Sequence, residues 1–173
     1  MKLVENSIYL ILLLLPTYLV RFEIFGIPFT LLEILIIAAF VLFLVEYKNK
    51  IVLGWWKWPL AVFLGAGLLS SIFSPDVISA LGFLKAYIIE PALLFIMIIN
   101  IRPSFKKMVY SLALSSLFIS VIDLFQYISG YGIPAPWNIR GPEFRITSVY
   151  DYPNAVGLFL APISVLMIGY IYT

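Results

Sequence analysis

Long apolar runs separated by short polar breaks are the main pattern of this chain. The runs span roughly residues 3–20, 28–45, 59–73, 84–101, 108–128 and 153–173. Their lengths approach the ~20 residues that a helix needs to cross about 30 Å of hydrocarbon. Inside lipid a segment must satisfy its own backbone hydrogen bonds, so each run is expected to be a helix. The pattern therefore predicts an all-α fold, a polytopic transmembrane helical bundle of about six spans.

Proline, glycine and tryptophan refine the limits of these helices. Pro16 is expected to bend the first helix, and the residues from Gly26 to Pro28 are expected to turn the chain back into the second. Residues 77–83 are expected to form a short interfacial segment before the fourth span. The pair Glu90-Pro91 places a proline inside that span, which frees a carbonyl and predicts a kink. The tryptophans within residues 55–58 have the composition of an aromatic belt at a membrane interface.

Composition places the chain in the membrane class and removes several kinds of chemistry. Of its 173 residues, 63% are hydrophobic and 12% are charged, which is far outside the soluble range. The net charge is +2 and the basic residues form short clusters, a pattern of topology signals and not of a nucleic-acid surface. Cysteine and histidine are absent, so the chain offers no thiolate or imidazole. No metal-ligand spacing is present, and neither a metal nor a cofactor is expected.

Basic residues in the loops predict the orientation of the spans. With a cytoplasmic N-terminus, seven of them lie inside: Lys2, Lys48, Lys50, Lys57, Arg102, Lys106 and Lys107. Four lie outside: Arg21, Lys85, Arg140 and Arg145. All compact clusters then fall on the cytoplasmic side, as the positive-inside rule requires. The loop of residues 129–152 is expected to be extracytoplasmic.

The two ends of the chain bear on its domain organisation. No small-residue cleavage site follows the first apolar run, so this run is expected to be a transmembrane helix and not a signal peptide. No basic residue follows the sixth run, where the positive-inside rule would place one. Residues 1–173 are therefore expected to form a single transmembrane domain, the N-terminal portion of a longer membrane protein.

Residues 140–162 bring the largest number of polar groups next to an apolar run. Pro153 is favoured in a first helical turn and Asp151 stands at a plausible N-cap, so a helix is expected to begin here. A helix N-terminus carries about half a positive charge and favours phosphate. Arg140 and Arg145 lie shortly upstream, and guanidinium groups bind phosphate oxygens in bidentate fashion. These features predict an anion site at lipid-headgroup depth. The alternative is that both arginines merely contact lipid headgroups.

Charged residues inside the apolar runs form a second group of candidates. Lys85, Glu90 and Asp123 are each expected to face the bundle interior, because a charge near a helix centre costs at least ~2.5 kcal/mol on insertion scales. Lys85 and Asp123 fall near the outer ends of their helices and are expected to pair. A tyrosine one helical turn from each carboxylate can satisfy it. Glu23 and Glu33 are expected to be interfacial. The alternative is a purely structural role, in which these charged side chains snorkel to the membrane surface or neutralise one another.

Aromatic side chains gather around the 129–152 loop, among them Trp137 and Tyr150. Their rings can stack on sugars, or they can anchor the protein at the membrane interface. The sequence pattern leaves both interpretations open.

Several short stretches carry a resemblance to a known family. Residues 145–157 read RITSVYDYPNAVG, an arginine followed after a short spacer by Pro-Asn at the start of a helix. Residues 15–19, 26–33 and 85–91 add shorter matches. The pattern resembles the O-antigen ligase and polymerase family of bacterial envelope glycosyltransferases. It implies transfer or polymerisation of a glycan from an undecaprenyl-pyrophosphate carrier to an acceptor glycan or lipid, at the outer face of the inner membrane and without a metal. The chain would correspond to the N-terminal half of such proteins.

The resemblance also implies roles for particular residues. Arg145 would bind the pyrophosphate and stabilise the charge that builds as the leaving group departs. Lys85 would assist at the outer end of its helix, and Asp151 is a candidate for the general base or only a helix cap. The substrate contacts would be Arg145, Arg140, Asn154 and Tyr150. Besides the lipid-linked donor and the acceptor, only membrane lipids are expected as partners.

Two other functions remain open at the level of sequence. A fragment of a transporter or flippase would account for the broken helix at Glu90-Pro91 and for the charges inside the spans. A structural membrane subunit without chemistry would account for the apolar composition alone.

Overall fold

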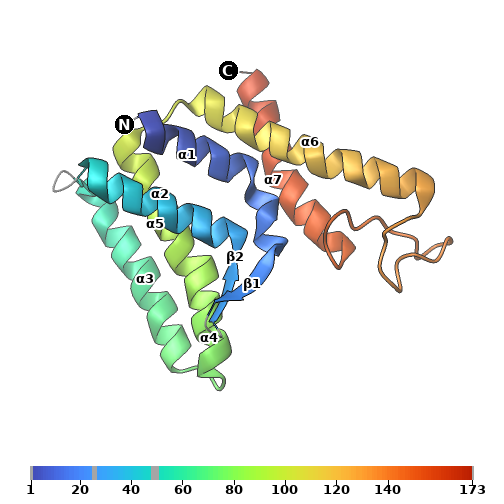
Figure 1. Cartoon of the computed structure of the whole chain (residues 1–173), viewed down its shortest axis with the longest axis horizontal. Coiled ribbons are helices and arrows are strands. Elements are labelled where there is room, and N and C mark those ends of the chain that lie inside the picture. Colours follow the sequence, from blue (N-terminus) through green and yellow to red (C-terminus); the bar gives the residue numbers. More distant parts are fainter. Residues whose placement is uncertain (1, 25–26, 48–50, 173) are drawn as a thin grey trace. The chain divides into compact units, whose positions relative to one another are not determined.

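The computed structural model describes residues 2–24, 27–47 and 51–172, and 74% of the structure is helical. The elements follow in order: α1 (Lys2–Leu13), a 3-10 turn (Leu15–Leu19), β1 (Arg21–Ile24), β2 (Ile27–Thr30), α2 (Leu31–Tyr47), a 3-10 turn (Gly54–Trp56), α3 (Lys57–Ile72), α4 (Val77–Phe83), a π-helical segment (Leu84–Ile89), α5 (Glu90–Ile101), α6 (Phe105–Ser129) and α7 (Pro153–Ile171). The predicted predominance of helix is confirmed (Figure 1).

Three helices in the described part of the chain are long and apolar enough to cross a membrane. They are the continuous helix Val77–Ile101 with 25 residues, α6 with 25 and α7 with 19. The helices α1, α2 and α3 are shorter, with 12, 17 and 16 residues. The structure therefore indicates a membrane protein with three clear candidate spans. A total of six spans and a cytoplasmic N-terminus stay predictions.

The chain folds as two compact units. Unit 1 comprises Met1–Ile11 and Arg21–Pro103, and unit 2 comprises Leu12–Val20 and Ser104–Thr173. Each unit has internal packing of its own. The single domain expected over residues 1–173 stays a prediction.

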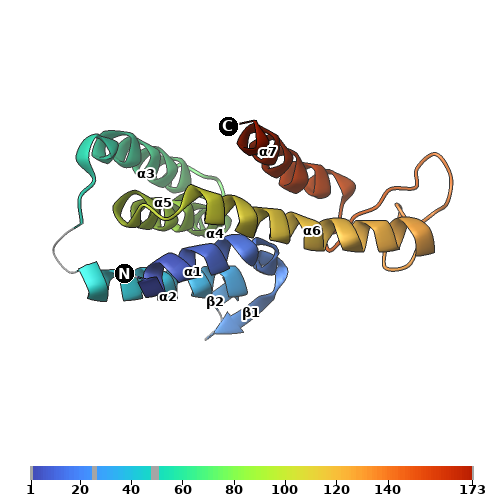
Figure 2. The same ribbon diagram turned by 90° about the horizontal axis from the view of Figure 1, so that it is seen from above.

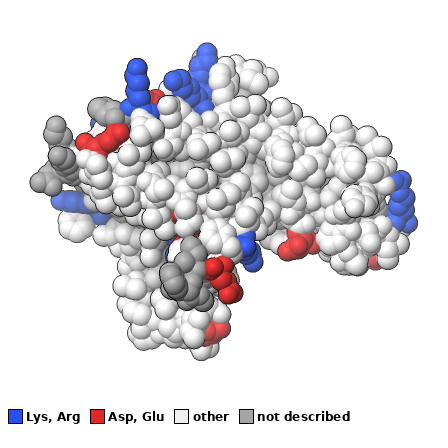
Figure 3. Space-filling model, viewed as in Figure 1, with Lys and Arg blue, Asp and Glu red and all other residues white. Residues whose placement is uncertain are grey.

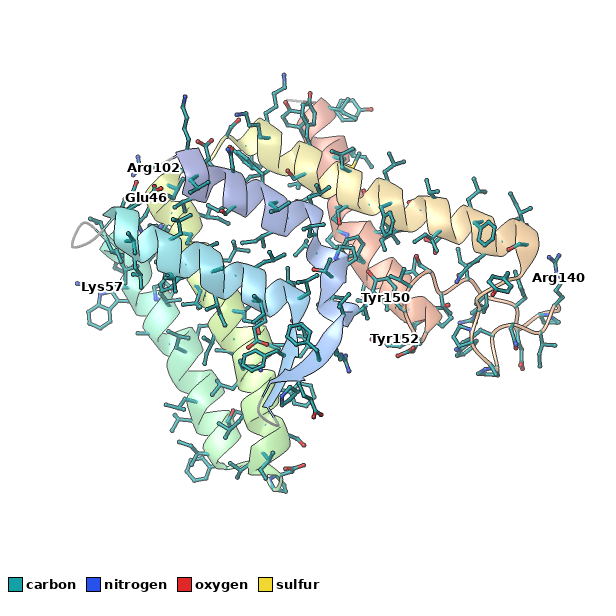
Figure 4. All side chains as sticks on the ribbon, viewed as in Figure 1. Glu46, Lys57, Arg102, Arg140, Tyr150 and Tyr152 are labelled. Atoms are coloured by element: carbon teal, nitrogen blue, oxygen red, sulfur yellow. The ribbon has the colours of Figure 1, made fainter. Side chains whose placement is uncertain are left out.

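Unit 1 is built on α2, α3 and the continuous helix Val77–Ile101, which lie side by side (Figure 1). A short turn at residues 74–76 reverses the chain between α3 and the continuous helix, which pack against each other. At one end, Tyr47 donates its hydroxyl to the carbonyl of Asn100 at 3.1 Å, and Asn100 Oδ1 accepts the Val52 amide at 2.8 Å. Glu46, Lys57 and Arg102 come from this same end (Figure 4). Lys48 and Lys50, predicted in the same basic cluster, lie outside the described residues.

A two-stranded antiparallel hairpin precedes α2, and this element corrects the all-α prediction. The strands pair Arg21 with Thr30 and Glu23 with Pro28. The second helix was expected to begin near Pro28, but it begins at Leu31. Thr30 Oγ1 accepts the Glu33 amide at 3.1 Å, and Glu33 Oε2 accepts the Thr30 amide at 3.4 Å. This reciprocal pair is a capping box, which fixes the helix start three residues later than expected.

The fourth apolar run forms one helix from Val77, where a separate interfacial segment over residues 77–83 was expected. Asp76 is the cause, because its carboxylate accepts the amide of Ser79 at 3.1 Å and the hydroxyl of Ser79 at 2.6 Å. Hydrogen bonding to Ser79 also lowers the pKa of Asp76. An N-cap of this kind starts a helix directly after the turn.

A π-helical segment, Leu84–Ile89, stands where Pro91 was expected to kink this helix. The Glu90 amide bonds to the Lys85 carbonyl, five residues back. Pro91 has no amide hydrogen to continue the regular pattern, so a wider turn absorbs the defect. The segment lies close to α3: a Cβ placed on Gly67 would approach Ile88 Cγ2 to 2.9 Å. Glycine at position 67 is thus required by close packing and not by backbone conformation.

Unit 2 packs α7 against α6 and joins them by the long loop 130–152 (Figure 2). Its core cluster contains Ile119 of α6, Tyr150 of the loop, and Ala155 and Val156 of α7. Tyr18 stacks on Tyr150 with ring centroids 6.2 Å apart. The first helix was expected to run to residue 20 with a bend at Pro16. Instead α1 ends at Leu13, and the 3-10 turn Leu15–Leu19 carries Tyr18 to this core.

The helix α6 buries more polar than apolar side chains and exposes many large apolar ones, unlike a typical soluble helix. Its buried residues include Ser115, Asp123 and Gln126, which are 1%, 6% and 3% exposed. Large apolar residues of the same helix, among them Leu117 and Leu124, are 57% and 60% exposed. The surface over the middle of α6 is correspondingly almost free of charged side chains (Figure 3). Lipid is as apolar as leucine, so this pattern costs nothing in a membrane and supports the membrane assignment of α6.

Candidate functional site

The site is organised around the first turn of α7, which begins at Pro153 as predicted. Asp151 was expected to be the N-cap, and that prediction is wrong. The N-cap is Tyr152, with extended backbone angles (φ −148°, ψ 147°), and its side chain makes no capping hydrogen bond. Asp151 is exposed instead. Among the described residues, no side-chain acceptor caps the positive end of α7, which favours an external anion.

A pocket of about 420 Å³ lies against this first turn. It is lined by Tyr127 of α6, by Phe144, Arg145 and Ile146 of the loop, and by Pro153, Val156 and Gly157 of α7. A Cβ on Gly157 would meet nothing within 4 Å, so the missing side chain leaves open space at the pocket wall. The pocket therefore combines one cation, a helix N-terminus and apolar walls.

Arg145 is the cation of this pocket. Its backbone amide donates to the Trp137 carbonyl at 3.2 Å, and its guanidinium carbon lies 5.7 Å from the centre of the Trp137 ring. The side chain is exposed. Among the described residues, no ion pair or side-chain hydrogen bond engages the guanidinium. The tryptophan positions the group, and its hydrogen-bond donors remain available for a ligand.

Arg140 lies further out on the loop (Figure 4) and is engaged by the protein. Its Nη2 donates to the carbonyl of Ile128 at 3.1 Å, at the C-terminal end of α6. Its guanidinium carbon lies 5.6 Å from the centre of the ring of Phe144, which lines the pocket. A cation at a helix C-terminus is stabilised by the helix dipole. Arg140 therefore holds the loop against α6 next to the pocket.

The two remaining predicted substrate contacts of this region differ in position. Asn154 is exposed in the first turn of α7, beside the pocket. Tyr150 is only 4% exposed and belongs to the core cluster. Its hydroxyl is buried and has no hydrogen-bond partner among the described residues. Burial, with Tyr18 and Asp123 nearby, raises the pKa of Tyr150, so this side chain stays neutral beneath the site. Its predicted contact with a sugar stays a prediction.

Lys85 pairs with Glu33 inside unit 1, where a pair with Asp123 was expected. Its Nζ lies 3.0 Å from Glu33 Oε1 and donates to the Pro28 carbonyl at 2.7 Å. The ammonium also lies 4.7 Å from the centre of the Phe29 ring. Glu33 was expected at the interface but is 1% exposed. The capping box turns Glu33 inward, and a buried carboxylate needs a cation.

The structure also gives several residues roles that the sequence pattern did not predict. Phe144 and Gly157 line the pocket, and no local signal distinguishes them from other aromatics and glycines. Tyr127, expected as a partner of Asp123 or as a ring that stacks on sugars, lines the pocket as well. Gln126 lies under the loop and bonds its backbone. A signal for Gln126 existed, because an amide in an apolar helix must find buried partners. Glu33 also had one, since Thr30-x-x-Glu33 has the spacing of a capping box.

Chemically, the arrangement is suited to bind an anion that has an apolar part. Arg145 and the α7 N-terminus supply positive charge, and Tyr127, Ile146 and Val156 supply apolar walls.

Comparisons with known proteins do not identify a family for the chain. No protein-family model, no curated protein and no solved structure matches it.

Proposed function

We propose that this pocket binds the pyrophosphate of an undecaprenyl-pyrophosphate-linked glycan. The protein then takes part in transferring or polymerising that glycan at the outer face of the bacterial inner membrane. One observation carries the proposal: the available guanidinium of Arg145 and the uncapped N-terminus of α7 line one pocket. The resemblance of residues 145–157 to the O-antigen ligase and polymerase family supplies the identity of the anion.

The physical fit of such a donor supports the proposal. A guanidinium binds two phosphate oxygens at once, and a helix N-terminus adds roughly half a positive charge. The polyprenyl chain needs apolar surroundings, which Ile146, Val156 and the exposed apolar side chains of α6 and α7 offer. A pocket at the start of a membrane-length helix can therefore hold the charged group while the chain lies in lipid.

The reaction places its largest demand on charge stabilisation. When the acceptor hydroxyl attacks the sugar, the bond to the pyrophosphate breaks and negative charge builds on the departing oxygen. Arg145 stabilises that charge more strongly than it stabilises the bound donor, which lowers the barrier. Asp151 is exposed next to the first turn of α7 and is the candidate to accept the hydroxyl proton. Lys85 is engaged by Glu33 in unit 1, and the proposal assigns it no contact with the donor.

Binding of an undecaprenyl-pyrophosphate analogue to the purified protein in nanodiscs tests the proposal. Replacing Arg145 by alanine should weaken binding by about 2 kcal/mol, roughly thirtyfold, because it removes a charge-assisted pair with phosphate. Arg21→Ala is the matched control, since Arg21 is another exposed arginine and belongs to the hairpin of unit 1. Equal and weak binding by wild type and both variants would show that Arg145 only contacts headgroups, and would overturn the proposal.

A second candidate, transport or flipping of a lipid-linked substrate, is favoured by a different observation. Glu33 and Glu90 are buried in unit 1, 1% and 7% exposed, and Lys85 of the π-helical segment pairs with Glu33. Charges next to a helix break are common at substrate pathways. A fluorescent lipid-linked sugar that changes leaflet in proteoliposomes with wild type, but not with Glu90→Gln, would favour transport.

A further inference from the structure

A single amide side chain ties the loop of unit 2 to α6. Gln126 is 3% exposed and makes four hydrogen bonds with loop backbone. Its Nε2 donates to the carbonyls of Gly132 at 3.1 Å and Ser148 at 2.8 Å. Its Oε1 accepts the amides of Thr147 at 3.0 Å and Ser148 at 2.8 Å. Both ends of the loop are thus joined through one side chain whose hydrogen-bonding groups are all used.

The bonds of Gln126 engage the backbone at a residue with a disfavoured conformation. Ser148 has φ +53°, in the left-handed region that disfavours residues with a side chain. Gln126 binds both the amide and the carbonyl of Ser148. The serine hydroxyl adds a bond to the Ile119 carbonyl at 3.3 Å. A strained residue persists only where its surroundings determine it, and such residues concentrate at functional sites.

Thr147 and Ser148, which bond to Gln126, connect Arg145 to the first turn of α7 in the chain. Arg145 precedes Thr147 by two positions, and α7 begins five positions after Ser148. Ile146, between Arg145 and Thr147, lines the pocket itself. Tyr150 follows closely and is fixed in the core cluster. The backbone at Thr147 and Ser148 therefore sets where the guanidinium of Arg145 stands relative to the first turn of α7.

We propose that Gln126 is the positioning residue of the anion pocket. It touches no part of the proposed donor, and it acts by fixing the loop so that Arg145 and the α7 N-terminus face the same phosphate group. This inference rests on the proposed function for the identity of the anion. It adds that donor affinity depends on a buried amide of α6, a residue outside the motif of residues 145–157.

Donor binding in nanodiscs, measured for single and double variants of the full chain, tests this role. Gln126→Leu should weaken binding of undecaprenyl pyrophosphate at least tenfold. It should weaken binding little further when Arg145 is already alanine, because the two residues act through one contact. Gln126→Glu keeps the oxygen that accepts the Thr147 and Ser148 amides, and should show an intermediate loss. Ser116→Ala is the matched control: it removes a buried hydroxyl of α6 that donates to the Ala113 carbonyl, within its own helix.

Hydrogen exchange distinguishes failure of this inference from failure of the proposed function. Gln126→Leu should speed exchange of the Thr147 and Ser148 amides at least tenfold and leave the interior of α7 unchanged. Unchanged exchange would overturn the positioning role whatever the donor does. Faster exchange throughout α6 and α7 would also overturn it, because Gln126 would then be a general stability residue. Faster exchange confined to the loop, with no binding of the donor by wild type, would support the role of Gln126 in fixing the loop and would overturn the proposed ligand.

Discussion

Lys85 in unit 1 and Arg145 in unit 2 are two cations with different surroundings. Lys85 belongs to the membrane-length helix Val77–Ile101, and Arg145 belongs to the loop that precedes α7. Lys85 pairs with the buried Glu33 and donates to a carbonyl. Arg145 stands on an aromatic ring with no carboxylate pairing it among the described residues. In a sequence both are basic residues near polar breaks. The partner therefore decides whether such a cation completes the fold or remains available for a ligand.

The largest effect is expected when the pair in unit 1 is broken. Lys85→Met should destabilise the protein by about 3 kcal/mol, because it leaves the Glu33 carboxylate buried without a cation. We place the loss at the low end for buried pairs, since the Lys85 side chain is 32% exposed. Thermal unfolding in detergent measures it. Lys57→Met, at an exposed lysine, is the control, and the double variant with Glu33→Gln should regain much of the loss. A loss of stability no greater than that of the control would contradict the interpretation that Lys85 stabilises the fold by pairing with Glu33.

The opposite behaviour is expected at Arg145. Arg145→Ala should reduce donor binding by about thirtyfold while changing the free energy of unfolding by less than about 0.5 kcal/mol, as for a surface residue. The two quantities, compared on one preparation, sharpen the contrast with Lys85. A marked fall in thermal stability would instead class Arg145 with Lys85 as a structural cation.

Glycines in the two units give a third test of the comparison. Gly67→Ala should cost about 1–2 kcal/mol, because the new methyl group would crowd Ile88. Gly65→Ala is the matched control in the same helix, where a Cβ meets nothing within 4 Å. Gly157→Leu should leave stability nearly unchanged and reduce donor binding, since its side chain would occupy the pocket. Equal losses of stability from Gly67→Ala and Gly65→Ala would show that α3 can shift away from the π-helical segment.

The smallest effect is expected at the cap of α4. The pKa of Asp76 is lowered from 3.8 by its hydrogen bonds with Ser79, so the carboxylate stabilises the fold above its unfolded pKa. This contribution is lost as the pH falls below about 4 through the folded pKa. Asp76→Asn should therefore lower thermal stability slightly at pH 6 and hardly at all at pH 3. An equal difference at both pH values would mean that charge plays no part in the cap.

Much of the local structure was predictable because the causes are local. Apolar length predicted α6 and α7, and Pro153 predicted where α7 begins, as the structure confirms. The errors also have local causes that were visible in the sequence. The spacing of Thr30 and Glu33 marks a capping box, and Asp76 followed by Ser79 marks an N-cap. Both were outweighed by hydrophobic length, which places helix ends only to within a few residues.

The pairing of charges was not predictable in the same way. Lys85 and Asp123 have matching positions in their spans, yet Lys85 bonds with Glu33, 52 positions away in the sequence, and Asp123 lies in the other unit. Asp123 Oδ1 is buried without a hydrogen-bond partner among the described residues. Sequence spacing constrains neighbours within one helix, whereas a contact between helices depends on which faces meet.

The amino-acid sequence alone was sufficient to predict long apolar helices, the loop between α6 and α7, and the position of Arg145 shortly before a helix start. These follow from hydrophobic length, proline and backbone hydrogen bonding, which act over a few residues. Three other features became visible when the helices were seen packed together. Lys85 is engaged while Arg145 is available, Gln126 bonds to Ser148 in its left-handed conformation, and Gly157 opens onto a pocket. Each of these depends on side chains that are distant in the chain and meet only when the helices pack.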